Sequence, residues 1–200
     1  SLKVAVVQGN ILQEIKWVES FRPNIFKKYK LLTEITNLKA EPDLIVWPET
    51  SFPDYLEFGD NDVPLRQFAS EAGAPLLVGS IRIKNLHYYN STLLFSTKGE
   101  VLGIYDKIHL VPFGEYIPVR SFIPFIERVL PIADFTPGIE FKIFAIAGAN
   151  GHVLKFATLI CFEDILSDLA SGFVRRGADF LVNMTNDAWF GDTSSPYEHM

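Results

Sequence analysis

The chain has 200 residues, of which 48% are hydrophobic and 14% aromatic, which is enough for one domain with a substantial core. Its formal net charge of −6 and the lack of a basic tract argue against nucleic acid as a partner. No apolar stretch approaches the roughly 18–20 residues that a membrane-spanning helix requires, and the first residues lack the pattern of a signal peptide.

Helices and strands are predicted to alternate along most of the chain. Short apolar runs bounded by turn-forming residues predict strands, and apolar positions with a period of about 3.6 predict helices. In chain order, we expect a strand at 4–7, a helix at 21–38, a strand at 44–47, a helix at 64–72, strands at 76–83, 89–96, 101–105 and 153–161, a helix at 165–176 and a strand at 180–185. Helices flanking mixed sheets indicate a layered α/β sandwich.

The segment 116–138 fits neither pattern. It is rich in large apolar side chains, but prolines interrupt it and prevent long regular structure. Two interpretations stay open: a loop packed on its own core, or a lid or arm that meets a bilayer or acyl chains. The segment 51–63, which mixes aromatic and acidic residues, is a weaker candidate for the second role.

Cys161 is the only cysteine, so it cannot form an internal disulfide. Free cysteine is often buried as a small hydrophobe, which makes inert packing the simpler interpretation of this position alone. Two other strand-like runs change that interpretation, because they lead into Glu49 and Lys107, charged residues that could serve a thiol. Since the carboxyl ends of buried strands commonly gather at one rim of an α/β fold, the three side chains could converge.

A thiol, a base and a cation are the parts of a cysteine nucleophile. The thiol has an ordinary pKa of about 8.5 and is mostly protonated at neutral pH, whereas the thiolate attacks. Glu49 could take the proton, and Lys107 could lower the pKa of the thiol and stabilise the oxyanion formed when sulfur adds to a carbonyl. Taken singly, both charges would be surface residues at loop starts; their combination with Cys161 predicts a site.

Three motifs carry a resemblance to a known family: Val46-Trp47-Pro48-Glu49, Tyr105-Asp106-Lys107 continuing to Phe113-Gly114-Glu115-Tyr116, and Leu159-Ile160-Cys161-Phe162-Glu163. They resemble the Glu-Lys-Cys motifs of the nitrilase superfamily, over nearly the whole chain. Gln8-Gly9-Asn10 with Lys16-Trp17, and the segments 112–118 and 186–191, resemble the catalytic domain of bacterial apolipoprotein N-acyltransferases. The resemblance implies that residues 1–200 form one nitrilase-like four-layer α-β-β-α sandwich, incomplete at its C-terminal end.

The same resemblance implies further site residues. Glu115 would orient Lys107 or share its proton, and Trp17, Phe162 and Glu163 would belong to the substrate site, Phe162 through a backbone N–H in the oxyanion hole. From the residues alone, Trp17 could instead be a hydrophobic anchor and Glu163 could cap the following helix. Phe162 stands where the family more often has tyrosine, which puts any role of a phenolic hydroxyl in doubt.

The resemblance also implies a two-step acyl transfer. Cys161 would take a fatty acyl chain from a phospholipid as a thioester and pass it to the N-terminal amine of a diacylglyceryl-cysteine lipoprotein. The enzyme would belong to the bacterial inner membrane, with this domain on the periplasmic side and membrane contact through a preceding membrane bundle and the segment 116–138. The chain begins almost directly in a strand and ends in no recognisable stop, so we expect a piece of a longer protein.

Two other functions stay open. A soluble amidase or carbamoylase of the same superfamily would use the same three residues with water as the acceptor. A non-catalytic module would bind a partner through the apolar segment and keep Cys161 as buried packing. His109 and His152 have no partners at metal-ligand spacing, and no glycine-rich phosphate loop occurs, so we predict no metal and no cofactor.

Overall fold

The larger sheet carries most of the strands in the computed structural model, which describes residues 2–59, 61–116, 134–148 and 151–186. Within these ranges it has six strands in the order β1-β2-β4-β5-β6, with β3 also paired to β4. The strands are β1 (Val4–Val6), β2 (Leu44–Val46), β3 (Tyr55–Leu56), β4 (Leu76–Lys84), β5 (His87–Phe95) and β6 (Val101–Asp106). Strands β1 to β4 pair in parallel, whereas β4, β5 and β6 pair antiparallel.

The smaller sheet has the order β7-β8-β9 in the described part of the chain. Its strands are β7 (Phe144–Ala147), β8 (Val153–Ile160) and β9 (Phe180–Met184). The helices are α1 (Gln13–Lys16), α2 (Arg22–Ala40), α3 (Val63–Glu71) and α5 (Ser167–Arg175), with 3-10 turns η1 (Glu19–Phe21) and η3 (Cys161–Ile165). Helix α2 ends where Glu41 takes a left-handed conformation with φ 45° and a proline follows.

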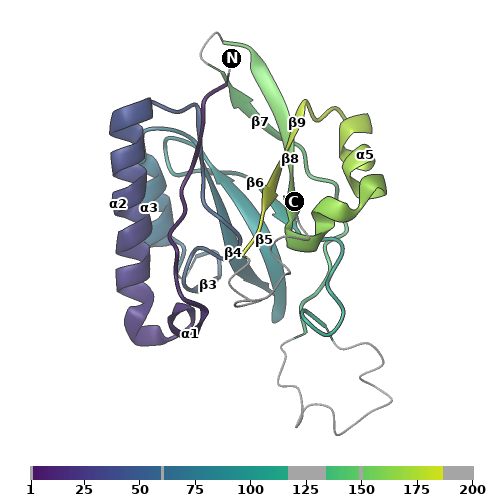
Figure 1. Cartoon of the computed structure of the whole chain (residues 1–200), viewed down its shortest axis with the longest axis horizontal. Coiled ribbons are helices and arrows are strands. Elements are labelled where there is room, and N and C mark those ends of the chain that lie inside the picture. The colour runs from purple at the N-terminus through teal and green to yellow at the C-terminus, as the bar shows by residue number, and fades with distance from the viewer. Residues whose placement is uncertain (1, 60, 117–133, 149–150, 187–200) are drawn as a thin grey trace, which may run out of the picture.

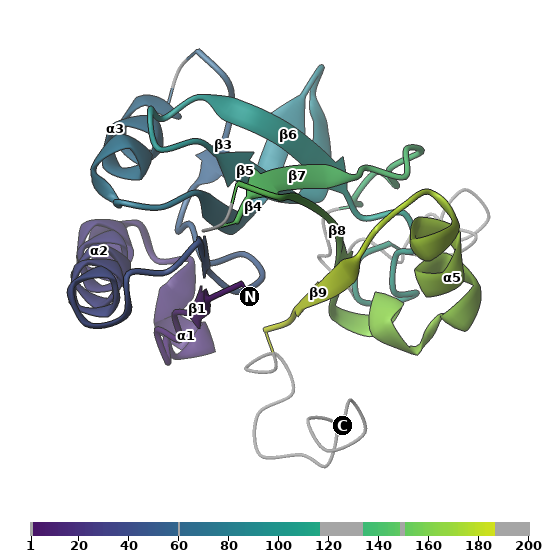
Figure 2. The ribbon, with the colours of Figure 1, turned by 90° about the horizontal axis from the view of Figure 1, so that it is seen from above.

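Four layers stack across the molecule. Figures 1 and 2 show α2 and α3 on the outer side of the larger sheet and α5 on the outer side of the smaller one. The outer core centres on Trp47, whose ring centroid lies 4.9 Å from that of Tyr29 on α2 and 5.7 Å from that of Phe68 on α3. The indole nitrogen donates to the Thr33 hydroxyl at 2.8 Å, so this buried polar group is paired. The predicted four-layer α-β-β-α sandwich is confirmed.

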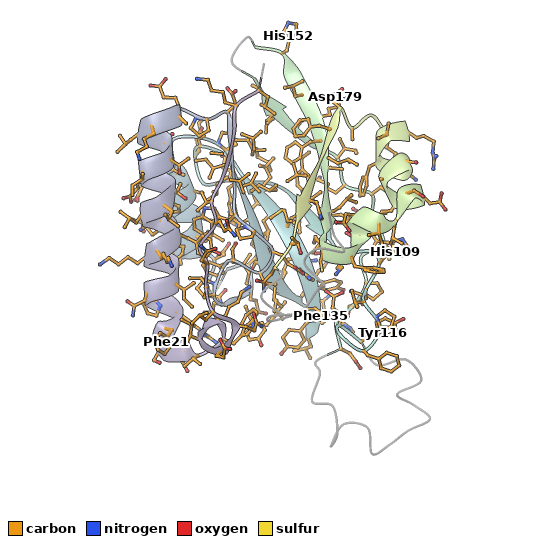
Figure 3. All side chains as sticks on the ribbon, in the orientation of Figure 1. Phe21, His109, Tyr116, Phe135, His152 and Asp179 are labelled. Carbon is orange, nitrogen blue, oxygen red and sulfur yellow. The ribbon has the colours of Figure 1, made fainter. Side chains whose placement is uncertain are left out.

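A second core joins the two sheets and α5. It contains residues of β2, β4, β5 and β6 together with residues of β7, β8 and β9. At its centre the hydroxyls of Thr92 on β5 and Thr158 on β8 lie 2.7 Å apart, and both side chains are fully buried. Figure 3 shows side chains filling the space between the layers, with His152 at one end of the molecule and Tyr116 and Phe135 at the other.

Most predicted elements are present with small shifts at their ends. The strand predicted at 153–161 stops at Ile160, because Cys161 turns into η3, and the following helix begins at Ser167. The short elements α1, β3 and β7 were not predicted. The segment 51–63, proposed as a weak lipid-facing candidate, instead contributes Phe52 and Leu56 to the core, with 5% and 0% of their surfaces exposed.

The interpretations of the segment 116–138 stay untested, because residues 117–133 lie outside the described ranges. The same holds for the motif at 186–191 beyond its first residue, and for the C-terminal end of the sandwich. Among the described residues, no helix is both long and apolar enough to cross a bilayer.

Candidate active site

Glu49, Lys107 and Cys161 follow three different strands and meet at one cavity. Glu49 comes after β2, Lys107 directly follows β6, and Cys161 directly follows β8. All three line a cavity of about 220 Å³, together with Asn90 and Glu115 and several apolar residues. The predicted convergence of strand ends is therefore present in the structure, and it draws on both sheets.

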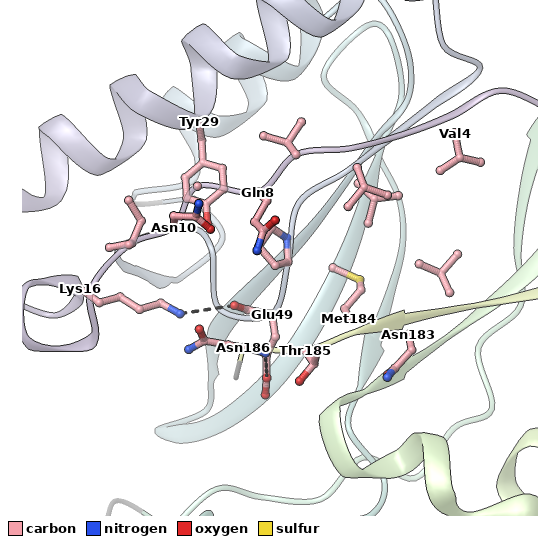
Figure 4. A pocket seen from close by; sticks show the side chains of 17 residues that line it. Val4, Gln8, Asn10, Lys16, Tyr29, Glu49, Asn183, Met184, Thr185 and Asn186 are labelled. Atoms are coloured by element: carbon pink, nitrogen blue, oxygen red, sulfur yellow. Dashed lines mark hydrogen bonds between the residues drawn. The ribbon is translucent and has the colours of Figure 1, made fainter. Parts of the chain in front are cut away.

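The carboxylate of Glu49 is buried, with 5% of the residue exposed, and both of its oxygens accept hydrogen bonds. The side-chain amide of Asn90 donates to Oε1 at 2.8 Å. The backbone N–H of Asn186 donates to Oε2 at 2.9 Å, a bond that Figure 4 shows. Burial raises the pKa of Glu49 above its ordinary value, while Lys107 and Asn90 act in the opposite direction. A raised pKa suits a carboxylate that must accept a proton during a reaction.

The ammonium of Lys107 is almost fully buried and forms an ion pair with Glu115 at 2.8 Å. Burial by itself would lower the pKa of Lys107, but Glu115 and Glu49 together raise it above the ordinary value, so the side chain stays a cation. The carboxylate of Glu115 is held in turn by the backbone N–H of Val111 at 2.9 Å. The expectation that Glu115 orients Lys107 agrees with this geometry.

Cys161 has a left-handed backbone conformation, with φ 53°, at the turn from β8 into η3. This conformation is uncommon for residues other than glycine, and such strain gathers at functional sites. Burial and the charge of Glu49 raise the pKa of the Cys161 thiol to about 11, although Lys107, the backbone N–H of Phe162 and the side chain of Thr185 lower it. Lys107 therefore lowers the pKa of the thiol, as predicted, but burial and Glu49 outweigh this effect. The thiol is neutral in the resting site.

The site residue that sequence reasoning missed is Asn90, in the middle of β5. Its amide nitrogen donates to Glu49 at 2.8 Å and to Glu115 at 2.8 Å, and its backbone carbonyl accepts from the N–H of Lys107 at 2.8 Å. Both amide hydrogens are thus used, which sets the orientation of the amide. The available signal was one amide beside Ser91 and Thr92 in a strand, and such an amide does not reveal its distant partners.

The turn that presents Glu49 lies against a glycine of β4. A Cβ added to Gly79 would lie 2.3 Å from the carbonyl oxygen of Pro48, 2.7 Å from the Cα of Glu49 and 2.8 Å from the nitrogen of Thr50. Real Cβ atoms do not approach backbone so closely, so this position requires glycine. Thr50 itself has φ 47°, which is unusual for a β-branched residue.

Glu163, predicted to bind substrate, is fully buried and holds the loop after β6 against the turn after β8. Its carboxylate accepts from the Tyr105 hydroxyl at 2.8 Å and from backbone N–H groups of Ile108, His109 and Ile160 at 2.9, 3.0 and 2.9 Å. It does not line the 220 Å³ cavity. Its position fixes Lys107 and Cys161 relative to each other.

Trp17 and Phe162, also predicted in the substrate site, do not line the 220 Å³ cavity. Trp17 follows α1 and stacks on Tyr55 with ring centroids 6.0 Å apart, and it is outside the cavity lining. Phe162 has 39% of its surface exposed, and its backbone N–H bonds to the Cys161 sulfur. In the described part of the chain, no group of three or more His, Cys, Asp or Glu is placed to hold a metal ion.

A buried carboxylate, a buried ammonium and a thiol around one cavity are the groups that a cysteine nucleophile needs to form covalent acyl intermediates. Residues 3–200 match the family model described as carbon-nitrogen hydrolase. The chain therefore belongs to the carbon-nitrogen hydrolase family, and the predicted membership of the nitrilase superfamily is confirmed.

Curated relatives point to one branch of this family. The chain is 40% identical to the apolipoprotein N-acyltransferase of Geobacter metallireducens and 39% identical to that of Brucella suis, covering 99% of this chain in both cases. It is 34% identical to apolipoprotein N-acyltransferase 2 of Treponema denticola. The chain spans 38% of the length of the first two relatives.

Solved structures share the fold. An amidase from Nesterenkonia sp. AN1 superposes with a TM-score of 0.67 at 16% identity, covering 98% of this chain and 68% of the amidase. A carbon-nitrogen hydrolase from Helicobacter pylori superposes with a TM-score of 0.63 at 18% identity, covering 92% of this chain and 59% of the other. These likenesses support the four-layer architecture described above.

Proposed function

We propose that this chain is the catalytic domain of an apolipoprotein N-acyltransferase that works through a thioester on Cys161. The observation that carries the proposal is the convergence of Glu49, Lys107 and Cys161 on one cavity, in a chain 34–40% identical to proteins of that name. The acyl donor is a membrane phospholipid, and the acceptor is the N-terminal amine of a diacylglyceryl-cysteine lipoprotein. The enzyme acts at the bacterial inner membrane, with this domain on the periplasmic side.

In the first step, the Cys161 sulfur adds to the ester carbonyl while its proton moves to Glu49. The new C–S bond leaves an oxyanion, which the ammonium of Lys107 and the backbone N–H of Phe162 stabilise. Collapse of this intermediate breaks the C–O bond, and the departing lysophospholipid oxygen takes the proton back from Glu49. The products are an acyl thioester and a lysophospholipid.

In the second step, the amine of the acceptor adds to the thioester carbonyl and gives a proton to Glu49. The C–S bond then breaks, and the sulfur recovers a proton, which restores the thiol. Because the thiol has a pKa of about 11, the site needs Glu49 at the moment of each transfer rather than a standing thiolate. Splitting the transfer into two steps predicts ping-pong kinetics.

The test is to trap the intermediate. Full-length protein given phospholipid without an acceptor should accumulate an acyl adduct on Cys161 that hydroxylamine removes, as read by intact-protein and peptide mass spectrometry. Cys161→Ala should show no adduct. An adduct elsewhere, or none, contradicts the mechanism, and a thioester that water discharges as fast as an added amine would favour an amidase instead.

A further inference from the structure

Lys16, the last residue of α1, is a buried cation that the proposed mechanism does not use. Only 4% of its surface is exposed, although lysine is almost never fully buried without a partner. It lines a second cavity of about 440 Å³, on whose wall Glu49 also lies. Glu49 thus lines both cavities, whereas Cys161 lines only the first and Lys16 only the second.

The contacts of Lys16 fall on the turn that presents the base. Its ammonium donates to the Thr50 hydroxyl at 2.7 Å and to the backbone carbonyl of Glu49 at 3.4 Å. Figure 4 shows the side chain extending from α1 toward Glu49. Thr50 has an unfavourable φ of 47°, so the hydrogen bond from Lys16 to its side chain stabilises a strained turn.

The charge of Lys16 acts on the same carboxylate. Burial raises the pKa of Glu49 and Glu115 raises it further, whereas Lys107, Asn90 and Lys16 lower it. Burial lowers the pKa of Lys16 itself to about 8, against the attraction of Glu49. At neutral pH the ammonium is therefore still mostly charged, and it favours the ionised form of the base.

We propose that Lys16 is a positioning residue for the general base: it holds the turn of Glu49 and Thr50 and supplies a second positive charge, besides that of Lys107, which favours the ionised form of Glu49. The inference rests on the role proposed for Glu49. Lys16 does not line the cavity of Cys161, so it acts through Glu49 and not on the substrate.

The experiment compares Lys16→Met and Lys16→Arg with the wild type in the full-length protein. The rate of acyl-thioester formation from phospholipid is measured across pH, together with the temperature of thermal unfolding. Lys16→Met should slow the reaction about tenfold at neutral pH. It should also move the acid limb of the pH–rate profile, where the rate falls as Glu49 becomes protonated, upward by about one pH unit, the size of effect that a nearby charge has on a carboxyl pKa. Lys16→Arg keeps the charge and should keep the acid limb. Lys27→Met, on the exposed face of α2, is the matched control and should behave as wild type.

An acid limb and rate unchanged in Lys16→Met would overturn the proposal. A lower unfolding temperature with an unchanged acid limb would also overturn it, because that is the mark of a structural lysine. If Lys16→Met does not fold, Thr50→Val is the deciding variant. It removes the 2.7 Å hydrogen bond from Lys16 and should slow thioester formation at neutral pH. Full activity of Thr50→Val would refute the claim that Lys16 stabilises the turn. Glu49→Gln separates the role proposed for Lys16 from the role proposed for Glu49. A fully active Glu49→Gln enzyme contradicts the proposed base and not Lys16 alone.

Discussion

The thiol of Cys161 lies among groups that shift its pKa in opposite directions. Burial and Glu49 favour the neutral thiol, while Lys107 and the donors from Phe162 and Thr185 favour the thiolate. The first set prevails, so the thiol is held in its less reactive, neutral form. In the mechanism proposed above, it becomes a good nucleophile when Glu49 takes its proton as the carbonyl approaches.

The same balance predicts that removing the base makes the thiol more acidic. Glu49→Gln deletes the negative charge beside Cys161, so the pKa of the thiol should fall below the wild-type value of about 11. Acyl transfer should nevertheless fall by about 10²–10⁴-fold, the usual contribution of a general base. Thiolate absorbance in the ultraviolet, followed against pH, measures the first effect, and phospholipid turnover measures the second.

Cys161→Ala, and Cys161→Ala combined with Glu49→Gln, serve as blanks that remove the absorbance of tyrosines from each titration. An unchanged or higher thiol pKa in Glu49→Gln would show that Glu49 is not a negative charge close to the sulfur. A normal turnover in the same variant would remove Glu49 from the mechanism.

Only part of this site could be predicted from sequence. Glu49, Lys107 and Cys161 could be found because each follows an apolar run, and strand ends meet at one rim. Asn90 could not, because it lies inside a strand and its bond to Glu49 joins residues 41 positions apart. Lys16 was part of a motif, but its burial depends on how α1 packs, which no local pattern reveals.

Among the elements, β4 lies against the backbone of the turn that carries the proposed base. Its residue Gly79 lies under the turn at Glu49, where backbone atoms leave no space for a Cβ. Gly79→Ala should displace this turn and reduce acyl transfer by about 10²-fold, since small misplacements of catalytic groups cost that much. The measurement is the rate of acyl-thioester formation by protein that thermal unfolding shows to be folded.

A matched control lies on α5. A Cβ at Gly172 would lie 2.7 Å from a ring atom of Phe141, so Gly172→Ala also adds a methyl group at a tight contact, but one made with a side chain. It should change stability and leave the rate of the folded protein near that of wild type. Equal losses of rate in both variants would mean that Gly79 acts through general stability and not through Glu49.

Elements with a clear sequence pattern of their own were predicted better than elements without one. Helix α2 spans 19 residues, with Ile25, Tyr29 and Thr33 buried one turn apart, and β2, although only three residues long, is buried on both faces and is part of an unbroken apolar run. By contrast, β3 has two residues and β7 has four. Such short strands owe their conformation to the neighbours with which they pair, and few residues carry the pattern.

At the scale of the whole molecule, the two sheets share one buried hydroxyl pair, Thr92 with Thr158. Either Thr92→Val or Thr158→Val leaves a buried hydroxyl without its partner and should cost about 1–3 kcal/mol of unfolding free energy. Both together remove the polar pair and keep the shape, so the double variant should be more stable than the sum of the two losses predicts. Thermal or denaturant unfolding of the wild type, the two single variants and the double variant gives the double-mutant cycle. Additive losses would show that the hydroxyls do not interact across the interface.

Cys161 belongs to the smaller sheet, whereas Glu49 and Lys107 belong to the larger one, and this separation has a consequence for synthesis. The strands that lead into the base and the cation, β2 and β6, are complete at Asp106, before β7 and β8 are made, and N-terminal parts generally fold first as a protein is made. Under the proposed mechanism, a nascent chain therefore completes the strands of the base and the cation before the ribosome has added the nucleophile. The thiol reaches the cavity only when the second sheet docks, so we expect that an unfinished chain is not acylated at this site.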